Sequence, residues 1–545
     1  MVDRHAQSGN STRKARQGRR RPARTKEPLV TQIASFVDLF VWLLVLKTFF
    51  LPLFIIPTGS MAETLMGAHA TCTCPNCGYE FPVGFHTPGG PNVVQCPNCR
   101  YQQPTQRDTP SGIRLNKKAG DRIVVNAWPF DIGGRLGPQR WDVVVFKNPN
   151  EPDVNYIKRL IGLPGETIEI IDGDVWVRKP GEDRLHPARK TKYAQQALWF
   201  PCFDQDYLPR EAAQDWVGAP VSRDLRRHQP RWPPYAPRFQ PVGESGGWRD
   251  LDTRMPVFDG AALPRREVQF VSQPGDDAPP ARILDTYGYN SNLVIAYHNV
   301  TDVRLSTDVR FEGGDGYVEL VISKYEDVFY ARLRADGRLT LAHENRAQPG
   351  REQWGQTQVR LPAGQFVRLA LGQADYAVAV EFDGRTVLAS SRDQYPITAA
   401  EARNRSRLGM IPTIRIAAAR VSASFAHVRI DRDIYYTSGN LRDRTAAGGG
   451  KPGTGTQGHP ITLKDDAYFV CGDNSPASLD SRAWSARSLG LHLRKAYEQG
   501  RYDIGTVPAS QMIGRAFFVY WPGFLPLTPG GPNLLPDIGR VRWIH

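Results

Sequence analysis

Three separated stretches of this 545-residue sequence carry side chains suited to acyl-transfer chemistry. The first contains Ser60, a hydroxyl nucleophile that follows a glycine in a short turn. The second contains Lys158, which shares one face of an expected strand with Tyr156 and Leu160, because residues i and i+2 of a strand point the same way. Burial of that face would lower the lysine pKa and make its neutral amine a general base for a serine. The third is the turn-rich stretch 472–482.

Each stretch alone also has an ordinary interpretation. Lys158 could be a surface lysine on an edge strand, and Ser60 a simple turn residue. Thr58 could help a backbone N–H group to stabilise an oxyanion, or it could only shape the same turn. The stretch 472–482 could be a polar loop whose side chains satisfy its own backbone groups. The chemical interpretation therefore depends on the three stretches occurring together.

Together these stretches resemble those of the bacterial type I signal peptidases, the membrane-bound leader peptidases with a serine–lysine dyad. PTGSMAETL is similar to the serine box of that family, YIKRLIGLPGETIEI to its lysine box and GDNSPASLDSR to its C-terminal box, in the same order. The resemblance covers residues 57–70, 112–178 and 461–522. It departs at Ala62-Glu63, where the family usually has an acidic or polar residue and then proline, and at Ser475-Pro476-Ala477, where it often has Arg-Asp-Asn.

By position, the resemblance implies that Ser60 is the nucleophile and Lys158 the general base. It assigns Thr58, with the backbone N–H of Ser60, to the oxyanion hole, and Ser478 to orienting the lysine. It gives structural roles in the C-terminal box to Gly472, Asp473, Asn474, Asp480 and Arg482. The implied activity is a serine endopeptidase that removes signal peptides from secretory preproteins after small residues, with no cofactor for catalysis.

Residues 29–56 are the only stretch long enough to cross a bilayer, which needs about 20 residues. Residues 1–28 carry a net charge of +7, half of the formal +14, and such basic flanks stay cytoplasmic. We expect a single-pass anchor in the cytoplasmic (inner) membrane, with the N-terminus in the cytoplasm and the catalytic domain outside. A cleaved signal peptide ending at Ala68-His69-Ala70 and a buried core helix are alternatives that fit the long basic tail less well.

Five of the seven cysteines lie close together, and four of them form two Cys-Pro-Asn-Cys knuckles, namely Cys74, Cys77, Cys96 and Cys99. This spacing is typical of a zinc ribbon and predicts a structural Zn²⁺ with four thiolate ligands. Cys72 is the expected spare, although it could exchange with Cys74. Disulfides are the alternative outside the membrane, but a pair within each knuckle would be strained. The ribbon has few basic neighbours, so we expect no nucleic-acid partner.

Short β-branched runs between Gly, Pro and Asp predict a mainly β fold. We expect an antiparallel catalytic domain in two parts, 57–180 and 461–545, with the zinc ribbon inserted at 71–104. Between the two parts we expect a loop-rich insertion (181–280), a concanavalin-like or jelly-roll β-sandwich (281–436) and a Gly-rich linker (437–460). The sequences Ala-Asp-Gly at 335–337 and Phe-Asp-Gly at 382–384 predict hairpin turns within the sandwich.

The composition, 41% hydrophobic and 23% charged, excludes a disordered chain and a polytopic membrane protein. Signal-peptide removal makes preproteins and the lipid bilayer the expected partners. A glycan or a protein is a candidate ligand of the sandwich. The main alternative is an inactive relative, a membrane-anchored binding protein, against which the retained Ser60 and Lys158 argue.

Overall fold

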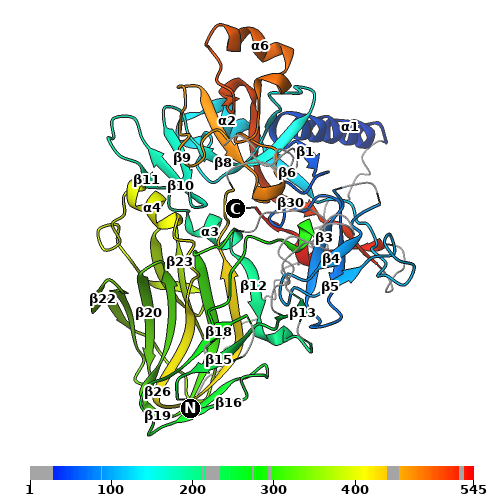
Figure 1. Cartoon of the computed structure of the whole chain (residues 1–545). Helices are drawn as coiled ribbons and strands as arrows, with labels where there is room; N and C mark the ends of the chain where they lie inside the picture. The colour runs from blue at the N-terminus through cyan, green and yellow to red at the C-terminus, as the bar shows by residue number, and fades with distance from the viewer. Residues whose placement is uncertain are drawn as a thin grey trace, which may run out of the picture. The chain divides into compact units, whose positions relative to one another are not determined.

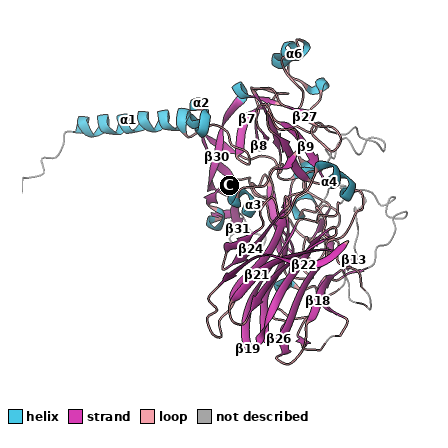
Figure 2. Ribbon diagram, turned by 90° about the vertical axis from the view of Figure 1, so that its left-hand side faces the viewer, coloured by secondary structure: helices cyan, strands magenta, loops and turns pink. Residues whose placement is uncertain are grey.

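The computed structural model describes residues 29–544 except 87–88, 212, 215–233, 245, 273–274, 276–277, 292–297, 438–452 and 527–532. The chain divides into two compact units, residues 1–50 and 51–545, and each is considered by itself. The basic tail and most of the expected Gly-rich linker lie outside the described residues. Strands dominate the second unit (Figure 2), which confirms the mainly β fold.

In the first unit, helix α1 (Leu29–Val45) continues into a five-residue π-helical segment, Leu46–Phe50. Among the described residues, no helix is both long enough and apolar enough to cross a membrane. The expected anchor segment, residues 29–56, thus contains a helical part that ends at Phe50. The helical segment stops before Pro52, whose ring cannot donate a helical hydrogen bond, and the chain then forms strand β1 (Leu53–Ile55).

One antiparallel sheet carries the lysine stretch and brings together strands from distant parts of the chain. Lys158 lies on β8 (Asn155–Gly162), between β7 (Val143–Lys147) and β28 (Ala467–Cys471). The strand order is β1-β6-β30-β7-β8-β28-β29, and β33 pairs with β30. The other strands of this sheet are β6 (Arg122–Asn126), β29 (Val507–Pro508), β30 (Met512–Trp521) and β33 (Arg542–Trp543).

A smaller antiparallel sheet follows the lysine stretch and has the order β11-β10-β9-β27. Its strands are β9 (Thr167–Ile171), β10 (Asp174–Arg178), β11 (His186–Pro187) and β27 (Ile461–Thr462). The chain leaves this sheet after β11 and returns to it at β27. The long insertion between these strands therefore begins and ends at the same sheet.

The insertion is built around two long strands, β19 (Val303–Lys324) and β26 (Ile414–Arg432), which pair with each other along most of their length (Figure 1). Their register shifts near Gly313 and Gly314, so that the first part of β19 also pairs with β23 and the second part with β20. Each long strand is thus part of both packed layers. The remaining strands are β20 (Asp327–Arg334), β21 (Arg338–Asn345), β22 (Gln348–Gln358), β23 (Val367–Ala374), β24 (Ala377–Phe382) and β25 (Arg385–Ala389).

Apolar side chains fill the space between the two layers, and Leu320, Phe329 and Phe425 are fully buried there. Both predicted hairpin turns are confirmed, because residues 335–337 join β20 to β21 and residues 383–384 join β24 to β25. Asp383 and Gly384 both have positive φ, at 46° and 74°, as a type I′ turn requires.

Residues 181–280, expected to be rich in loops, contribute five strands to the sheet of the insertion. These strands are only two to six residues long, and three of them pair directly with β26. Their pairing partner lies more than 140 residues further along the chain, so their own short, proline-rich sequences give little sign of them. They are β12 (Phe200–Asp204), β15 (Arg238–Val242), β16 (Trp248–Arg249), β17 (Val257–Gly260) and β18 (Arg266–Val271).

The cysteine-rich segment forms two hairpins, β2 (His69–Thr73) with β3 (Glu80–Gly84) and β4 (Val93–Gln95) with β5 (Gln102–Pro104). Two further two-stranded pairs and several short helices complete the described part of the second unit. They are β13 (Ala213–Gln214), β14 (Pro234–Tyr235), β31 (Phe524–Pro526), β32 (Asn533–Pro536), α2 (Trp128–Ile132), α3 (Lys192–Ala197), α4 (Ala399–Ser406) and α6 (Leu491–Glu498).

Candidate active site

The serine and lysine predicted from the sequence lie against each other in the structure. The Nζ atom of Lys158 is 2.7 Å from the Oγ atom of Ser60, within hydrogen-bonding distance, and 3.0 Å from the carbonyl oxygen of Ile157. Ser60 lies in a turn shortly after β1 and is half-buried, whereas Lys158 is only 3% exposed. Two residues 98 positions apart in the chain thus form one pair.

Burial disfavours the charged form of the Lys158 side chain. Loss of solvation lowers its pKa from 10.5 to about 8, even though the carboxylates of Asp480 and Asp473 act in the opposite direction. Lys158 shares one face of β8 with Tyr156 and Leu160, as predicted. Its Nζ atom lies 5.1 Å from the ring centre of Tyr156, and Leu160 is fully buried. The arrangement supplies a hydroxyl and an adjacent amine that is partly neutral near pH 7.

Two buried ion pairs hold the loop 472–482 beside this pair. Arg159, the neighbour of Lys158, donates two hydrogen bonds to the Asp473 carboxylate at 2.8 and 2.7 Å, and both side chains are fully buried. Asp480 binds Arg482 through both of its oxygens, at 2.9 and 2.7 Å, and accepts a hydrogen bond from the Gly472 N–H. Burial alone would raise the pKa of Asp480, but the Arg482 guanidinium outweighs burial and the pKa is lowered. The loop therefore keeps its charges while buried.

Gly472 and Asn474 bring this loop onto the serine turn. A Cβ atom on Gly472 would lie 2.4 Å from the Ser60 carbonyl oxygen and 2.3 Å from the Ser478 Oγ, so only glycine fits. The Asn474 N–H donates to the Ser60 carbonyl at 3.0 Å, and its side-chain amide donates to the Gly59 carbonyl at 2.9 Å. Of the residues expected to be structural, these two touch the serine turn directly.

Two predicted residues do not reach the serine–lysine pair. The Ser478 hydroxyl is buried and makes no hydrogen bond to Lys158 among the described residues, whereas its interaction with the Asp480 carboxylate helps to lower the pKa of that acid. Thr58 is exposed, and no hydrogen bond of its side chain to the pair is found in the described part of the chain. Thr58 lies two residues before Ser60 in the serine turn, and the Ser478 Oγ lies beside Gly472, close to the Ser60 backbone.

Sequence reasoning missed three residues of the insertion that contact the loops of the site. Asn290 exchanges hydrogen bonds with the Asn474 side chain, and the hydroxyls of Tyr287 and Tyr289 donate to the carbonyls of Asp473 and Ala68. These residues lie in and beside a single 3₁₀ turn, Gly288–Asn290. No motif or periodicity marks them, because all their partners are more than 180 positions away.

The four knuckle cysteines form a cluster that could hold a metal ion, with their sulfur atoms all within 4.8 Å of one another. The Sγ atoms of Cys74 and Cys99 are 3.6 Å apart, and those of Cys77 and Cys96 are 3.7 Å apart. A tetrahedral zinc with Zn–S bonds of about 2.3 Å requires sulfur separations of about 3.8 Å, so this donor set fits zinc. Cys72 stays outside the cluster and accepts a hydrogen bond from Gln103.

A second group of acidic side chains, Asp174, Asp375 and Asp433, is also close enough to hold a cation. Two buried lysines, Lys190 and Lys324, form ion pairs with these carboxylates. Lys190 pairs with Asp375 and Asp433 at 2.7 and 2.6 Å, and Lys324 pairs with Asp174 at 2.9 Å. These carboxylates belong to an internal ion network and not to a metal site.

Known protein families were found that are similar to the parts of the chain that form this site. The family model described as "Signal peptidase, peptidase S26" matches residues 101–215 and 418–521, which include Lys158 and the loop 472–482. The signal peptidase I of Pseudomonas aeruginosa is 32% identical over 155 residues, covering 26% of this chain and 36% of that protein. The signal peptidase I of Rickettsia akari is 55% identical over 54 residues, covering 10% of this chain and 20% of its own length. The chain thus spans 36% of the length of the first of these relatives and 20% of the second.

The solved structures that resemble this chain share only a distant fold likeness with it. A carbohydrate-binding module, CBM66 from Bacillus subtilis, is 11% identical and covers 35% of this chain and 94% of its own, with a TM-score of 0.23. A Bacillus licheniformis β-glucanase is 6% identical and covers 36% and 92%, with the same TM-score of 0.23. The family model and the curated relatives confirm the expected resemblance: over the matched residues, the chain is similar to the type I signal peptidases.

Proposed function

We propose that this chain is a serine endopeptidase that removes signal peptides from exported preproteins. The observation that carries the proposal is the 2.7 Å contact between Ser60 Oγ and the buried amine of Lys158. An amine with a pKa of about 8 is partly neutral at physiological pH, so it is able to accept the hydroxyl proton. No metal or organic cofactor is needed for this chemistry.

In the proposed mechanism, the neutral Lys158 amine takes the proton of Ser60 while Oγ attacks the carbonyl carbon after a small residue of the preprotein. The backbone N–H of Ser60, with the Thr58 hydroxyl, stabilises the oxyanion. The lysine then gives its proton to the leaving amine, and an acyl-enzyme forms. The leaving amine is the N-terminus of the mature protein. Lys158 next activates a water molecule that hydrolyses the acyl-enzyme and releases the signal peptide from Ser60. Ser478 would orient the lysine from the loop 472–482, where its Oγ lies beside Gly472.

We also propose that the chain acts at the cytoplasmic membrane, with residues 29–50 as a single anchor and the N-terminus in the cytoplasm. The apolar helix α1 with its π-helical continuation would extend about 30 Å, close to the thickness of the hydrocarbon core. Exposed apolar side chains on the catalytic sheet, Ile55 and Trp543, offer a surface for the lipid. Ile56, the next residue after Ile55, is buried in the core. The lipid surface is tested by vesicle flotation of a chain that lacks residues 1–50, compared with the same shortened chain carrying Trp543→Ser.

For the cysteine cluster we propose a structural Zn²⁺ held by Cys74, Cys77, Cys96 and Cys99. The sulfur separations support zinc over disulfides. The side-chain amides of Asn76 and Asn98 approach Cys99 and Cys77 at 3.8 Å, which would stabilise bound thiolates. Four protein ligands leave no open position, so the ion would support the fold and not the hydrolysis.

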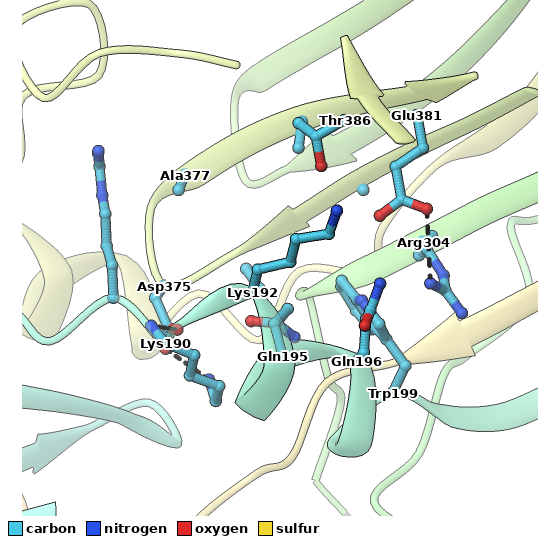
Figure 3. Close-up of a pocket in the computed structure, with 14 residues that line it drawn as sticks. Lys190, Lys192, Gln195, Gln196, Trp199, Arg304, Asp375, Ala377, Glu381 and Thr386 are labelled. Carbon is cyan, nitrogen blue, oxygen red and sulfur yellow. Dashed lines mark hydrogen bonds and ion pairs between the residues drawn. The ribbon is translucent and has the colours of Figure 1, made fainter. Parts of the chain in front are cut away.

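A pocket of about 160 Å³ on the insertion supports a second, binding function (Figure 3). It lies between α3 with the adjoining Trp199 and the strands β23 to β25. The Lys192 side chain extends from α3 toward Thr386 and Glu381, and the Arg304 guanidinium stacks 5.2 Å from the Trp199 ring centre. An aromatic ring can pack against the apolar face of a sugar ring, and neighbouring amine, carboxylate and hydroxyl groups can form hydrogen bonds with the hydroxyls of the sugar. We therefore propose a glycan as the ligand of the sandwich.

The glycan proposal is testable without reference to peptidase activity. Titration of the full chain with a panel of neutral and acidic disaccharides, followed by tryptophan fluorescence, should show saturable binding that Trp199→Ala removes. A chain that binds none of the panel, or a Trp199→Ala variant that binds as well as the wild type, would refute this pocket as a glycan site.

The peptidase proposal is tested by processing of a preprotein with an Ala-x-Ala site by the detergent-solubilised full chain. Wild type should cleave after the small residue, and both Ser60→Ala and Lys158→Ala should lose cleavage while remaining folded. Lys147→Ala is the matched control, because Lys147 lies on the neighbouring strand β7 but is exposed. Folded wild type that cleaves none of several preproteins would favour the alternative of an inactive, membrane-anchored binding protein.

A further inference from the structure

The insertion contributes a short segment to the loops around Ser60. We name residues 287–291 the strap; it contains the 3₁₀ turn Gly288–Asn290 and comes directly before the gap at 292–297 in the described residues. Its three central side chains, Tyr287, Tyr289 and Asn290, are 5%, 1% and 3% exposed. They are buried against catalytic-domain loops and not within the sandwich core.

Asn290 and Asn474 form a reciprocal amide pair. The Nδ2 of Asn290 donates to the Oδ1 of Asn474 at 2.6 Å, and the Nδ2 of Asn474 donates to the Oδ1 of Asn290 at 2.8 Å. The same Nδ2 of Asn474 donates its second hydrogen to the Gly59 carbonyl at 2.9 Å. A carboxamide has two donor hydrogens, so Asn474 has no donor to spare. Asn290 therefore determines which way the Asn474 side chain faces, and hence whether it can hold Gly59.

Asn474 in turn holds the nucleophile. Its backbone N–H donates to the Ser60 carbonyl at 3.0 Å, so the residue binds two successive carbonyls of the serine turn. Without Asn290, the Asn474 Oδ1 would lose its donor in a site closed to water. A buried polar atom without a partner is costly, and a rotation of the side chain that relieved the loss would release Gly59.

The two tyrosines hold the same loops at other points. The Tyr289 ring lies so close to Gly59 that a Cβ atom there would be 2.0 Å from it, and the Tyr289 hydroxyl donates to the Ala68 carbonyl at 3.0 Å. The Tyr287 hydroxyl donates to the Asp473 carbonyl at 3.0 Å, one residue before Asn474. The strap thus contacts both ends of the serine loop and the loop that carries the lysine's buried counter-charges.

We infer that the strap of the insertion is part of the peptidase site, with Asn290 a positioning residue that holds Ser60 against Lys158 through Asn474. This inference rests on the proposed peptidase function. It assigns to the insertion a role in catalysis that is separate from any ligand of its pocket. Because general-base catalysis needs the hydroxyl and the amine in near-ideal contact, a displacement of about 1 Å is enough to lower the rate about 100-fold.

The test compares three full-length variants with wild type. Asn290→Ala removes both hydrogen bonds, and Asn290→Asp keeps the shape but places an acceptor against the Asn474 Oδ1. Asn345→Ala is the matched control, because Asn345 is also an asparagine of the insertion with two hydrogen bonds, to Asp327 and to the backbone of Ala347, in the hairpin of β21 and β22.

With an Ala-x-Ala preprotein, both Asn290 variants should lose about 10- to 100-fold in kcat with little change in KM, and Asn345→Ala should match wild type. A loosened serine loop would also admit water to Lys158. The pH profile of kcat/KM should therefore move about one unit to higher pH in the Asn290 variants. A uniform loss of folded protein would lower the rate without moving the midpoint, so the profile separates positioning from simple destabilisation.

Amide hydrogen exchange of residues 57–68 and 472–480 gives a readout that needs no activity. Both segments should exchange faster in the Asn290 variants and be unchanged in Asn345→Ala. The inference would be overturned if both segments exchanged at the wild-type rate in the Asn290 variants. It would also be overturned if wild type is active and the Asn290 variants keep its kcat and pH profile. If wild type cleaves no preprotein, the proposed function fails, but faster exchange confined to these segments would still support the strap as the support of the serine loop.

Discussion

The pKa of Lys158 leads to a quantitative prediction about the pH dependence of cleavage. A value of about 8 in place of 10.5 corresponds to about 3.4 kcal/mol against the charged form. At pH 7, about one tenth of the molecules would carry a neutral lysine, compared with about 3 in 10,000 for an unshifted lysine. Burial thus increases the active base about 300-fold at this pH.

The direction follows from the role of the amine as a base. Only the neutral form accepts the Ser60 proton, so kcat/KM should rise about tenfold per pH unit below pH 7, reach half of its maximum near pH 8 and then level off. The midpoint of kcat/KM reports the free enzyme, which is the state described by the structure.

The assay is cleavage of a short fluorogenic peptide with an Ala-x-Ala site between pH 5.5 and 10, at substrate concentrations far below KM. Circular dichroism at each pH identifies any loss caused by unfolding, and Lys147→Ala should give the wild-type profile. A midpoint at or above pH 10, or a rate that is flat between pH 6 and 9 in the folded enzyme, would refute the assignment of the buried Lys158 as the base.

Two further predictions concern the supports of the site. Wild type and Cys72→Ser should each release about one zinc per chain when the cysteines are modified in the presence of a metal indicator. Removal of the zinc by a chelator should lower the melting temperature. If wild type releases no zinc, or if Cys72→Ser no longer releases it, the four-cysteine site is wrong. Gly59→Ala should lower kcat at least about tenfold, because the new Cβ would lie 2.0 Å from Tyr289, whereas Gly313→Ala, with no atom within 4 Å, should be neutral. Tyr289→Ala added to Gly59→Ala should relieve the clash, and activity of Gly59→Ala equal to wild type would rule out the close packing.

The sequence predicted the serine–lysine pair because three stretches that are ordinary alone occur together, in the order of the type I signal peptidase motifs. Ser60 follows a glycine in a short turn, and Lys158 lies in an alternating strand whose face could be identified from two neighbours. The supporting asparagine pair could not be found in the same way. Asn290 and Asn474 are 184 positions apart, and an asparagine in a loop has many ordinary uses. Only the folded chain shows that their amides complete each other.

The fold was predictable to a similar degree. Alternating β-branched residues indicated a mainly β chain, and Asp-Gly pairs identified two hairpin turns. The strands between residues 200 and 271 were missed because each is too short to show a period and is completed only by pairing with β26 or with one another. Composition alone does not show that the apolar residues Leu53–Ile55, which follow Pro52, pair with β6 as a strand.

The insertion is joined to the catalytic domain by charges as well as by the strap, and this leads to the last prediction. Glu169 of β9 binds Arg403 of α4, and Asp174 of β10 binds Lys324 of β19 at 2.9 Å. The carboxylates of Glu169 and Asp174 are 0% and 4% exposed. In each pair the acid belongs to the small sheet of the catalytic domain and the base to the insertion. Removal of the insertion would therefore take the cationic partner from both acids, although Glu169 would keep the hydrogen bond from the Gly458 N–H.

A chain in which a short Gly-Ser linker replaces residues 190–436 should therefore be strongly destabilised and should not cleave preproteins. Loss of one partner of a buried ion pair costs about 3–5 kcal/mol, which for two pairs is comparable to the whole stability of a domain. Glu169→Gln with Asp174→Asn in the shortened chain should recover part of the stability, measured by urea unfolding, because neutral amides are cheaper to bury. Cleavage should stay low even then, since Asn474 would still lack Asn290. A shortened chain with wild-type stability and activity would show that the insertion is a detachable module, and both the ion-pair argument and the strap would be wrong.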